Sequence, residues 1–91
     1  MQNFPDLNGT WRSNTYRTIY LVEQSSGGDI KISGYAEGEA HFLKNMPNKI
    51  KVELYGLGRG EFSVSNSSDK IVGTMNYYDG TVEYDTLVKI D

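Results

Sequence analysis

The residue best suited to acid–base chemistry in this chain is its only histidine, His41. A catalytic histidine needs a nucleophile or a carboxylate held beside it, and the neighbouring sequence offers no such arrangement. His41 stands between Ala40 and Phe42, and this alternation predicts that the imidazole points outward into solvent. With one histidine and no cysteine, the usual ligands of a zinc site are also missing. We therefore predict no catalytic residue and no metal ligand, and we expect that the chain is not an enzyme.

Two carboxylates near the C-terminus, Glu83 and Asp85, are a second candidate for chemistry. Paired carboxylates hydrolyse glycosides when they flank the substrate at a defined separation, and carboxylates also bind divalent ions. The two residues alternate with Val82 and Tyr84. In a strand, this spacing puts both carboxylates on the face opposite the apolar residues. We therefore expect Glu83 and Asp85 to belong to a solvated strand face.

Two further segments have compositions that anion-binding sites use. Lys44, Lys49 and Lys51 surround residues 45–48, where they form either an anion site or a solubilising rim. The run Gly-Leu-Gly-Arg-Gly at 56–60 has the glycine density of a phosphate-binding loop. Such a loop leads into a helix, however, and a strand pattern follows here. The glycines are better explained by a turn followed by a bulge or a bend of the sheet.

Three tyrosines recur at equivalent places in the sequence. Tyr35, Tyr55 and Tyr77 each follow an aliphatic residue by five positions and precede a glycine by three. The spacing fits a repeated hairpin with a tyrosine just before the turn, and the chance similarity of strands in a meander explains it equally well. Such positions line one rim of a sheet, where tyrosine's apolar ring and polar hydroxyl suit a ligand or a partner. We predict that binding uses these tyrosines, with charge supplied by Lys49 and Lys51.

The elements that position these residues are predicted to be short β-strands. Alternation of apolar and polar residues dominates, and no window shows helical periodicity. Loop residues cluster at 25–28, 45–48 and 65–68, and Asp79-Gly80 predicts a two-residue type I′ turn. The pattern predicts eight strands, at residues 9–13, 16–24, 29–35, 38–44, 49–55, 58–65, 70–78 and 81–90.

The connections between these strands are too short for parallel crossovers, so neighbouring strands must pair antiparallel. An up-and-down meander of eight strands buries its apolar face by closing into a small barrel. The alternation assigns these residues to the interior: Ile19, Leu21, Ile30, Ile32, Ala40, Phe42, Ile50, Val52, Phe62 and Val64. The tyrosines expected outside are Tyr20, Tyr35, Tyr55 and Tyr78. If all the interior residues point inward, little room remains for a ligand, which needs about 300 Å³ or more.

The opening of the chain resembles a known group of barrels. Gly9-Thr10-Trp11 on the first strand, followed by an antiparallel meander, resembles the calycins, which include lipocalins, fatty-acid-binding proteins and avidins. The resemblance implies a barrel with a ligand in its mouth and Trp11 as a structural plug at one end. The set of tryptophans and polar residues that cradles a biotin-like ring in avidins is missing, because Trp11 is the only tryptophan. In size and strand count the chain also resembles minimal barrels that sense cyclic nucleotides.

Composition bounds the remaining possibilities. At 91 residues the chain is expected to be one domain, 1–91. The net charge of −3 argues against binding to extended nucleic acid. No apolar run reaches the roughly 18 residues of a membrane span, and the N-terminus lacks the pattern of a signal peptide. Together with the absence of cysteine, this favours a cytoplasmic location.

These observations predict a non-enzymatic binding protein without a cofactor. The first hypothesis is a calycin-like barrel that holds a small apolar or nucleotide-like ligand. The alternative is a protein-interaction module, or a small inhibitor, that binds a partner protein through exposed tyrosines. The volume left inside the barrel discriminates between the two, because a filled barrel can bind only through its surface.

Overall fold

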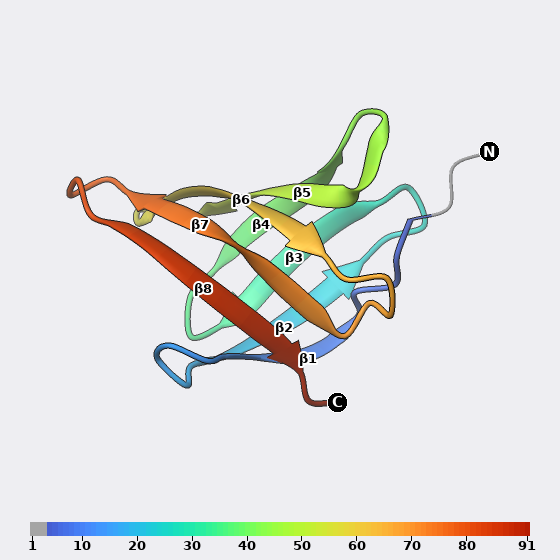
Figure 1. Ribbon diagram of the computed structural model, residues 1–91, viewed down its shortest axis with the longest axis horizontal. Helices are drawn as coiled ribbons and strands as arrows, with labels where there is room; N and C mark the ends of the chain where they lie inside the picture. The colour runs from blue at the N-terminus through green and yellow to red at the C-terminus, as the bar shows by residue number, and fades with distance from the viewer. Residues whose placement is uncertain (1–3) are drawn as a thin grey trace.

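The computed structural model describes residues 4–91, which form a closed antiparallel β-barrel (Figure 1). The predicted all-β meander is confirmed, since the eight strands follow one another around the barrel in chain order and β1 pairs with β8. Within the described residues, no helix is long and apolar enough to cross a membrane. The strands are β1 (Gly9–Ser13), β2 (Ile19–Gln24), β3 (Asp29–Gly34), β4 (Gly38–Leu43), β5 (Met46–Leu54), β6 (Gly58–Val64), β7 (Lys70–Tyr77) and β8 (Val82–Lys89).

The up-and-down topology sorts the connections onto two ends of the barrel. We call the end formed by the turns after β1, β3, β5 and β7 the mouth end; it lies on the left in Figure 1. We call the opposite end the plug end, because the N-terminal residues 4–8 and the turns after β2, β4 and β6 gather there. Every hairpin tip at one end is therefore separated from those at the other by the length of a strand.

Two predicted connections differ in detail from those observed. The segment 45–48 is not a loop, because β5 already begins at Met46 and the turn is confined to Lys44 and Asn45. Asn45 takes the left-handed conformation, with φ of 67°, that such a tight turn requires. The turn at Asp79-Gly80 is not type I′, because only Gly80 has a positive φ. Its amide bonds to the carbonyl of Tyr77, and this makes a three-residue loop that ends in a left-handed glycine.

The interior of the barrel is a compact apolar core. Its buried members are Leu7, Trp11, Ile30, Ala40, Ile50, Leu54, Phe62, Val64, Ile71 and Met75. Glycines fill the neighbouring inward positions of β4, β6 and β7, and they let the strands approach closely. A Cβ atom on Gly73 would lie 2.6 Å from the ring of Phe62 and would also collide with the carbonyl of Glu61. The glycines at 58 and 60 are thus positions of close packing inside β6, rather than only a turn and a bend.

The predicted facing of β2 is wrong. Ile19 and Leu21 are exposed, whereas Tyr20 and Val22 line the interior. Every residue from Ile19 to Val22 is apolar or aromatic, so alternation alone does not choose between the two faces. The space on the neighbouring strands decides, because Tyr20 pairs with Gly34 on β3.

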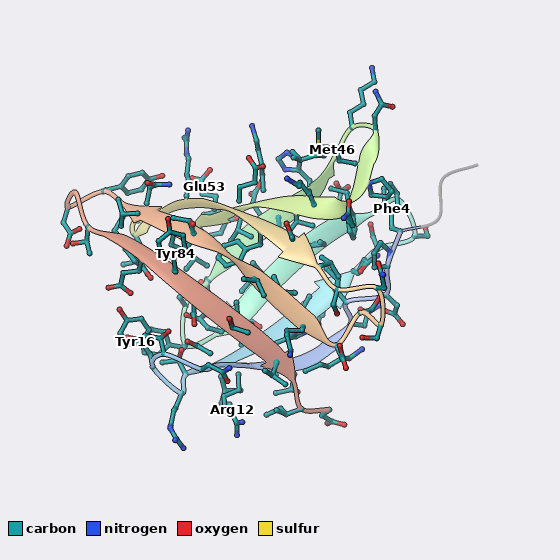
Figure 2. The ribbon with its side chains drawn as sticks, viewed as in Figure 1. Phe4, Arg12, Tyr16, Met46, Glu53 and Tyr84 are labelled. Carbon is teal, nitrogen blue, oxygen red and sulfur yellow. The ribbon has the colours of Figure 1, made fainter. Side chains whose placement is uncertain are left out.

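The predicted facing of β8 is also wrong, although its residues alternate clearly. Tyr84 is the most exposed of the large apolar side chains (Figure 2), whereas Asp85 and Leu87 line the interior. Asp85 pairs with Gly73 on β7, and the ring of Phe62 packs over that glycine. Glu83 pairs with the buried Met75 and shares the inward face. The pair of carboxylates is therefore not a solvated strand face.

Candidate functional site

The plug end of the barrel is closed by the N-terminal segment. Leu7 is buried inside the barrel, and its carbonyl accepts a 2.9 Å hydrogen bond from the Nε1 of Trp11. The Leu7 amide donates to Oε1 of Gln24 on β2, and the Gln24 side-chain amide donates to the carbonyl of Pro5. Phe4 stacks on Phe42 with their ring centroids 4.5 Å apart. Trp11 is 0% exposed, so together with Leu7 it seals this end against water.

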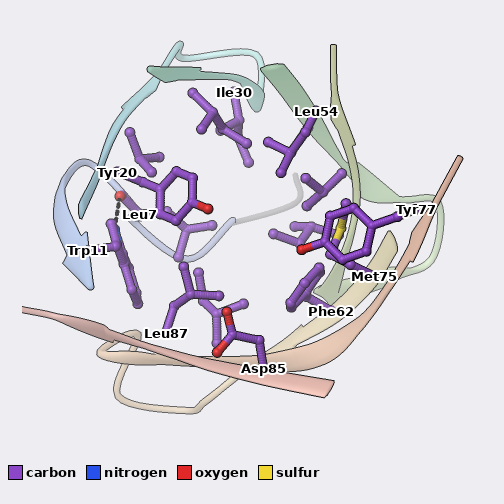
Figure 3. Close-up of a pocket in the computed structure, with 16 residues that line it drawn as sticks. Leu7, Trp11, Tyr20, Ile30, Leu54, Phe62, Met75, Tyr77, Asp85 and Leu87 are labelled. Atoms are coloured by element: carbon purple, nitrogen blue, oxygen red, sulfur yellow. Dashed lines mark hydrogen bonds between the residues drawn. The ribbon is translucent and has the colours of Figure 1, made fainter. Parts of the chain in front are cut away.

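Above this plug, the interior contains a cavity of about 70 Å³. Most of its lining is aliphatic or aromatic, and the polar atoms of the lining come mainly from Tyr20, Tyr77 and Asp85. All three lie toward the mouth end, and Figure 3 shows their oxygen atoms directed toward the central space. The cavity is therefore an apolar well that is closed below by Leu7 and ringed above by hydroxyl and carboxylate groups.

Asp85 is held in place by hydrogen bonds to both of its carboxylate oxygens. The hydroxyl of Ser13, a residue with no exposed surface, donates to Oδ2 at 2.7 Å. The backbone amides of Thr86 and Thr15 donate to Oδ1 at 2.8 and 3.4 Å. Bonds to both oxygens fix the position of a carboxylate. The carboxylate thus stands as a preorganised negative charge at the edge of the cavity.

The aromatic part of the site consists of three tyrosines. Burial raises the pKa of Tyr20, and the negative charge of Asp85 acts in the same direction. Burial also raises the pKa of Tyr77, and Tyr20 and Asp85 add to that effect. The ring of Tyr35 meets the ring of Tyr20 edge-on, with centroids 6.1 Å apart. The phenols of Tyr20 and Tyr77 therefore stay protonated near pH 7, and each offers both a donor and an acceptor.

The mouth end has a strong excess of negative charge. Its basic residues among residues 4–91 are Arg12, Arg17 and Arg59, and Arg59 lies 3.6 Å from Glu53 in an ion pair. The acids of the turns and adjoining strand ends at the mouth are Glu37, Glu39, Glu53, Asp79, Glu83 and Asp85. The lysines of the described chain lie in the middle of the barrel or toward the plug end. The negative net charge of the protein is therefore concentrated around the opening.

The predicted binding residues are only partly brought together. Tyr35 and Tyr77 lie at the mouth beside Tyr20, with Tyr35 69% exposed and Tyr77 lining the cavity. Tyr55 lies at the same end, where its hydroxyl donates to Oε1 of Glu39 at 2.6 Å on the outer surface.

The lysines that were predicted to accompany the tyrosines lie elsewhere. Lys51 is exposed on the outer face of β5, opposite the exposed His41 on β4. Lys49 pairs with Ser63 on β6, farther toward the plug end. It is six residues from Tyr55 along β5, a distance of roughly 20 Å.

The third copy of the predicted repeat is not equivalent to the first two. Ile30 and Ile50 are buried, whereas Val72, which holds the same place in the third copy, is exposed. The tyrosine follows this aliphatic residue by five positions in each copy, so the two side chains face opposite sides of the sheet. Tyr77 therefore points toward the interior, whereas Tyr35 and Tyr55 point outward. Sequence reasoning therefore missed Tyr20, Asp85 and Ser13 as site residues. The signal that could have found Tyr20 and Asp85 is the glycine opposite each of them.

Comparison with protein-family models, with curated protein sequences and with solved structures finds no match to this chain. Among residues 4–91, no group of three or more His, Cys, Asp or Glu side chains is arranged to hold a metal ion.

Proposed function

We propose that this protein is a non-enzymatic binding barrel that takes a small ligand into its mouth end. The observation that carries the proposal is the apolar cavity, which is sealed at the plug end by Leu7 and ringed at the mouth by Tyr20, Tyr77 and Asp85. Apolar wells with a few convergent polar groups are the usual form of small-molecule sites. The calycin resemblance implies the same arrangement, a barrel with a ligand in its mouth. On these grounds we propose that the protein resembles the calycins in ligand binding as well as in barrel architecture.

The size of the cavity limits what can enter. Sites for drug-sized ligands measure about 300–1,000 Å³. The cavity of about 70 Å³ falls short of the roughly 300 Å³ expected for a ligand held wholly inside the barrel, so only a short apolar group can enter while the rest of the ligand stays at the rim. The negative charge around the opening repels phosphate groups, which favours an apolar ligand over a nucleotide-like one.

A titration with n-butanol tests the proposal, because this alcohol has a chain short enough for the cavity. In two-dimensional ¹H–¹⁵N NMR spectra, we expect saturable shifts at residues that line the cavity, such as Tyr20, Leu54 and Leu87. The variant Ala40→Val adds carbon atoms inside the cavity and is expected to abolish these shifts. The matched control is Ala36→Val, which enlarges a residue outside the cavity lining and keeps the shifts. Unsaturable shifts spread over the surface would contradict the proposal.

One observation favours a second candidate, the binding of a partner protein through the rim. Tyr16, Tyr35, Tyr55 and Tyr78 are all at least half exposed at the mouth end. Tyrosine is enriched at protein interfaces, where its ring is buried and its hydroxyl bonded. Ala40→Val distinguishes the two candidates. Filling the cavity is expected to abolish binding of a small ligand, whereas binding of a partner protein should persist because the rim is unchanged.

A further inference from the structure

The chemical character of the mouth narrows the class of ligand. Figure 3 shows the Tyr20 and Tyr77 hydroxyls and the Asp85 carboxylate turned toward the same central space from β2, β7 and β8. In this view along the barrel the two tyrosine rings are seen nearly face-on, so their faces also lie across the opening, and their oxygen atoms and those of Asp85 form a ring around its centre. Such a ring suits a group that donates several hydrogen bonds, and Asp85 adds a fixed negative charge.

The hydrogen bonding of Asp85 leaves capacity for such a donor. A carboxylate has about four acceptor sites, and Ser13, Thr86 and Thr15 occupy three of them. Glu83 lies two residues before Asp85, nearer the turn, and shares the inward face of β8. Its Oε2 is buried without a hydrogen-bond partner among the described residues. Buried acceptors are normally bonded, so this second carboxylate oxygen also favours a ligand that donates.

The charge distribution points in the same direction. The six acids around the opening outnumber the three arginines there, and one of these arginines is already paired with Glu53. A concave site lined by one sign of charge concentrates ligands of the opposite sign. Anionic groups are thereby disfavoured at the mouth, and cationic groups are favoured.

The volume of the cavity limits the length of the ligand's apolar part. A cavity of about 150 Å³ accepts a molecule the size of benzene. The cavity of about 70 Å³ below the oxygen ring is therefore large enough only for a short alkyl chain. Tyr20, Leu54 and Leu87 are among the side chains that such a chain would contact.

From these observations we infer that the mouth binds an alkylammonium group, with the short alkyl chain in the apolar well and the ammonium bonded to Asp85, Tyr20 and Tyr77. The inference rests on the proposed function and names the ligand class for the same site. An ammonium group has three donors, which matches three oxygen heads around one space. A free alkylamine carries this group with its alkyl end unattached, whereas the alkyl chain of a lysine ends at a backbone that cannot enter the sealed well.

The test compares three probes of equal chain length: n-butylammonium, n-butanol and butyrate, each titrated at one ionic strength and followed by NMR shifts. We expect n-butylammonium to bind at least about tenfold more tightly than n-butanol, and butyrate to bind least, because bonds to charged groups are the stronger ones. In Asp85→Asn, which keeps the shape and most of the hydrogen bonds, the preference for n-butylammonium should disappear.

The matched control is Asp79→Asn, which removes a charge from the same end at a residue outside the cavity lining. It is expected to keep most of the preference. Equal affinity for n-butanol and n-butylammonium, or an Asp85→Asn variant with unchanged preference, would overturn the inference while leaving the proposed function standing. Failure of all three probes to bind would instead remove the proposed function itself.

A further arm tests the orientation of the ligand. The probe is N-acetyl-lysine N-methylamide, in which the butylammonium chain is attached to a peptide backbone at the carbon farthest from the nitrogen. We expect it to bind more weakly than n-butylammonium, because the backbone cannot follow the alkyl chain into the sealed well. Binding as tight as that of n-butylammonium, with the same dependence on Asp85, would overturn the inferred orientation.

Discussion

Trp11 and Asp85 illustrate how single side chains define the two ends of this barrel. Trp11 makes its one side-chain hydrogen bond to the chain that plugs the barrel, whereas Asp85 accepts bonds from residues around the mouth. The first could be anticipated from its place in Gly9-Thr10-Trp11, because a lone tryptophan on an opening strand is a natural core residue. The inward position of Asp85 could not be anticipated, because an aspartate that alternates with Tyr84 and Thr86 is expected to face solvent.

Replacement of Trp11 by alanine tests the closure of the plug end. The change removes a fully buried aromatic side chain and the donor to the Leu7 carbonyl. We expect it to lower the free energy of unfolding by about 3–5 kcal/mol. Urea unfolding followed by circular dichroism measures this loss. A loss below about 1 kcal/mol would show that the N-terminal segment is not anchored by Trp11.

The raised pKa values of Tyr20 and Tyr77 predict a dependence of stability on alkaline pH. Both groups lose their protons later in the folded state than in the unfolded state, for which the reference value is 10.0. Their contribution is therefore complete below pH 10 and is lost as the pH rises through the folded pKa values. In Tyr20→Phe the decline in melting temperature above pH 10 should be shallower. An identical decline in the variant would contradict the burial of this phenol.

At the scale of elements, the number, order and antiparallel pairing of the strands could be predicted from alternation and from the short connections. The facing of β2 and β8 could not, because both strands carry apolar residues on both faces. Which face turns inward depends on the glycines of neighbouring strands, and this is a property of the sheet rather than of one strand. The errors therefore fall on the two strands that supply Tyr20 and Asp85 to the site.

The role of the inward glycines can be tested at Gly73. An alanine there would press its Cβ atom against Phe62 and the backbone of Glu61, and we expect a loss of about 1–3 kcal/mol from overpacking. Gly27 is a matched control, because a Cβ atom there would meet only Ser25 Oγ at 3.9 Å. Thermal unfolding of Gly73→Ala and Gly27→Ala compares them. Equal stability of the two variants would mean that the barrel does not depend on this close approach.

At the scale of the whole molecule, the barrel combines a sealed apolar end with an open acidic one. Its closing seam, between β1 and β8, pairs only Trp11, Arg12 and Ser13 with β8, whereas β7 pairs with β8 along seven positions. Ser13 adds a side-chain bond across this seam to Asp85. The residue that presents charge to the mouth thus also helps to close the barrel.

This double role predicts the behaviour of Ser13→Ala. The variant deprives Asp85 Oδ2 of its donor, and we expect a loss of about 1–3 kcal/mol in stability. Amide hydrogen exchange should accelerate at the seam, for example at Asn14 and Ile90, more than at the β4–β5 pairing. Uniform acceleration over all strands would show that the bond stabilises the barrel without a special role at the seam.

The most direct measurement of the central claim is the set of intermolecular nuclear Overhauser effects between n-butylammonium and the protein. We expect cross-peaks from the probe's methyl group to the methyl groups of Ile71 and Leu87, which line the cavity toward the plug end. We also expect cross-peaks from the methylene group beside the nitrogen to the rings of Tyr20 and Tyr77 at the mouth. Cross-peaks only to exposed side chains such as Leu21 or Val72 would contradict the claim, because the probe would then lie on the outer surface of the barrel.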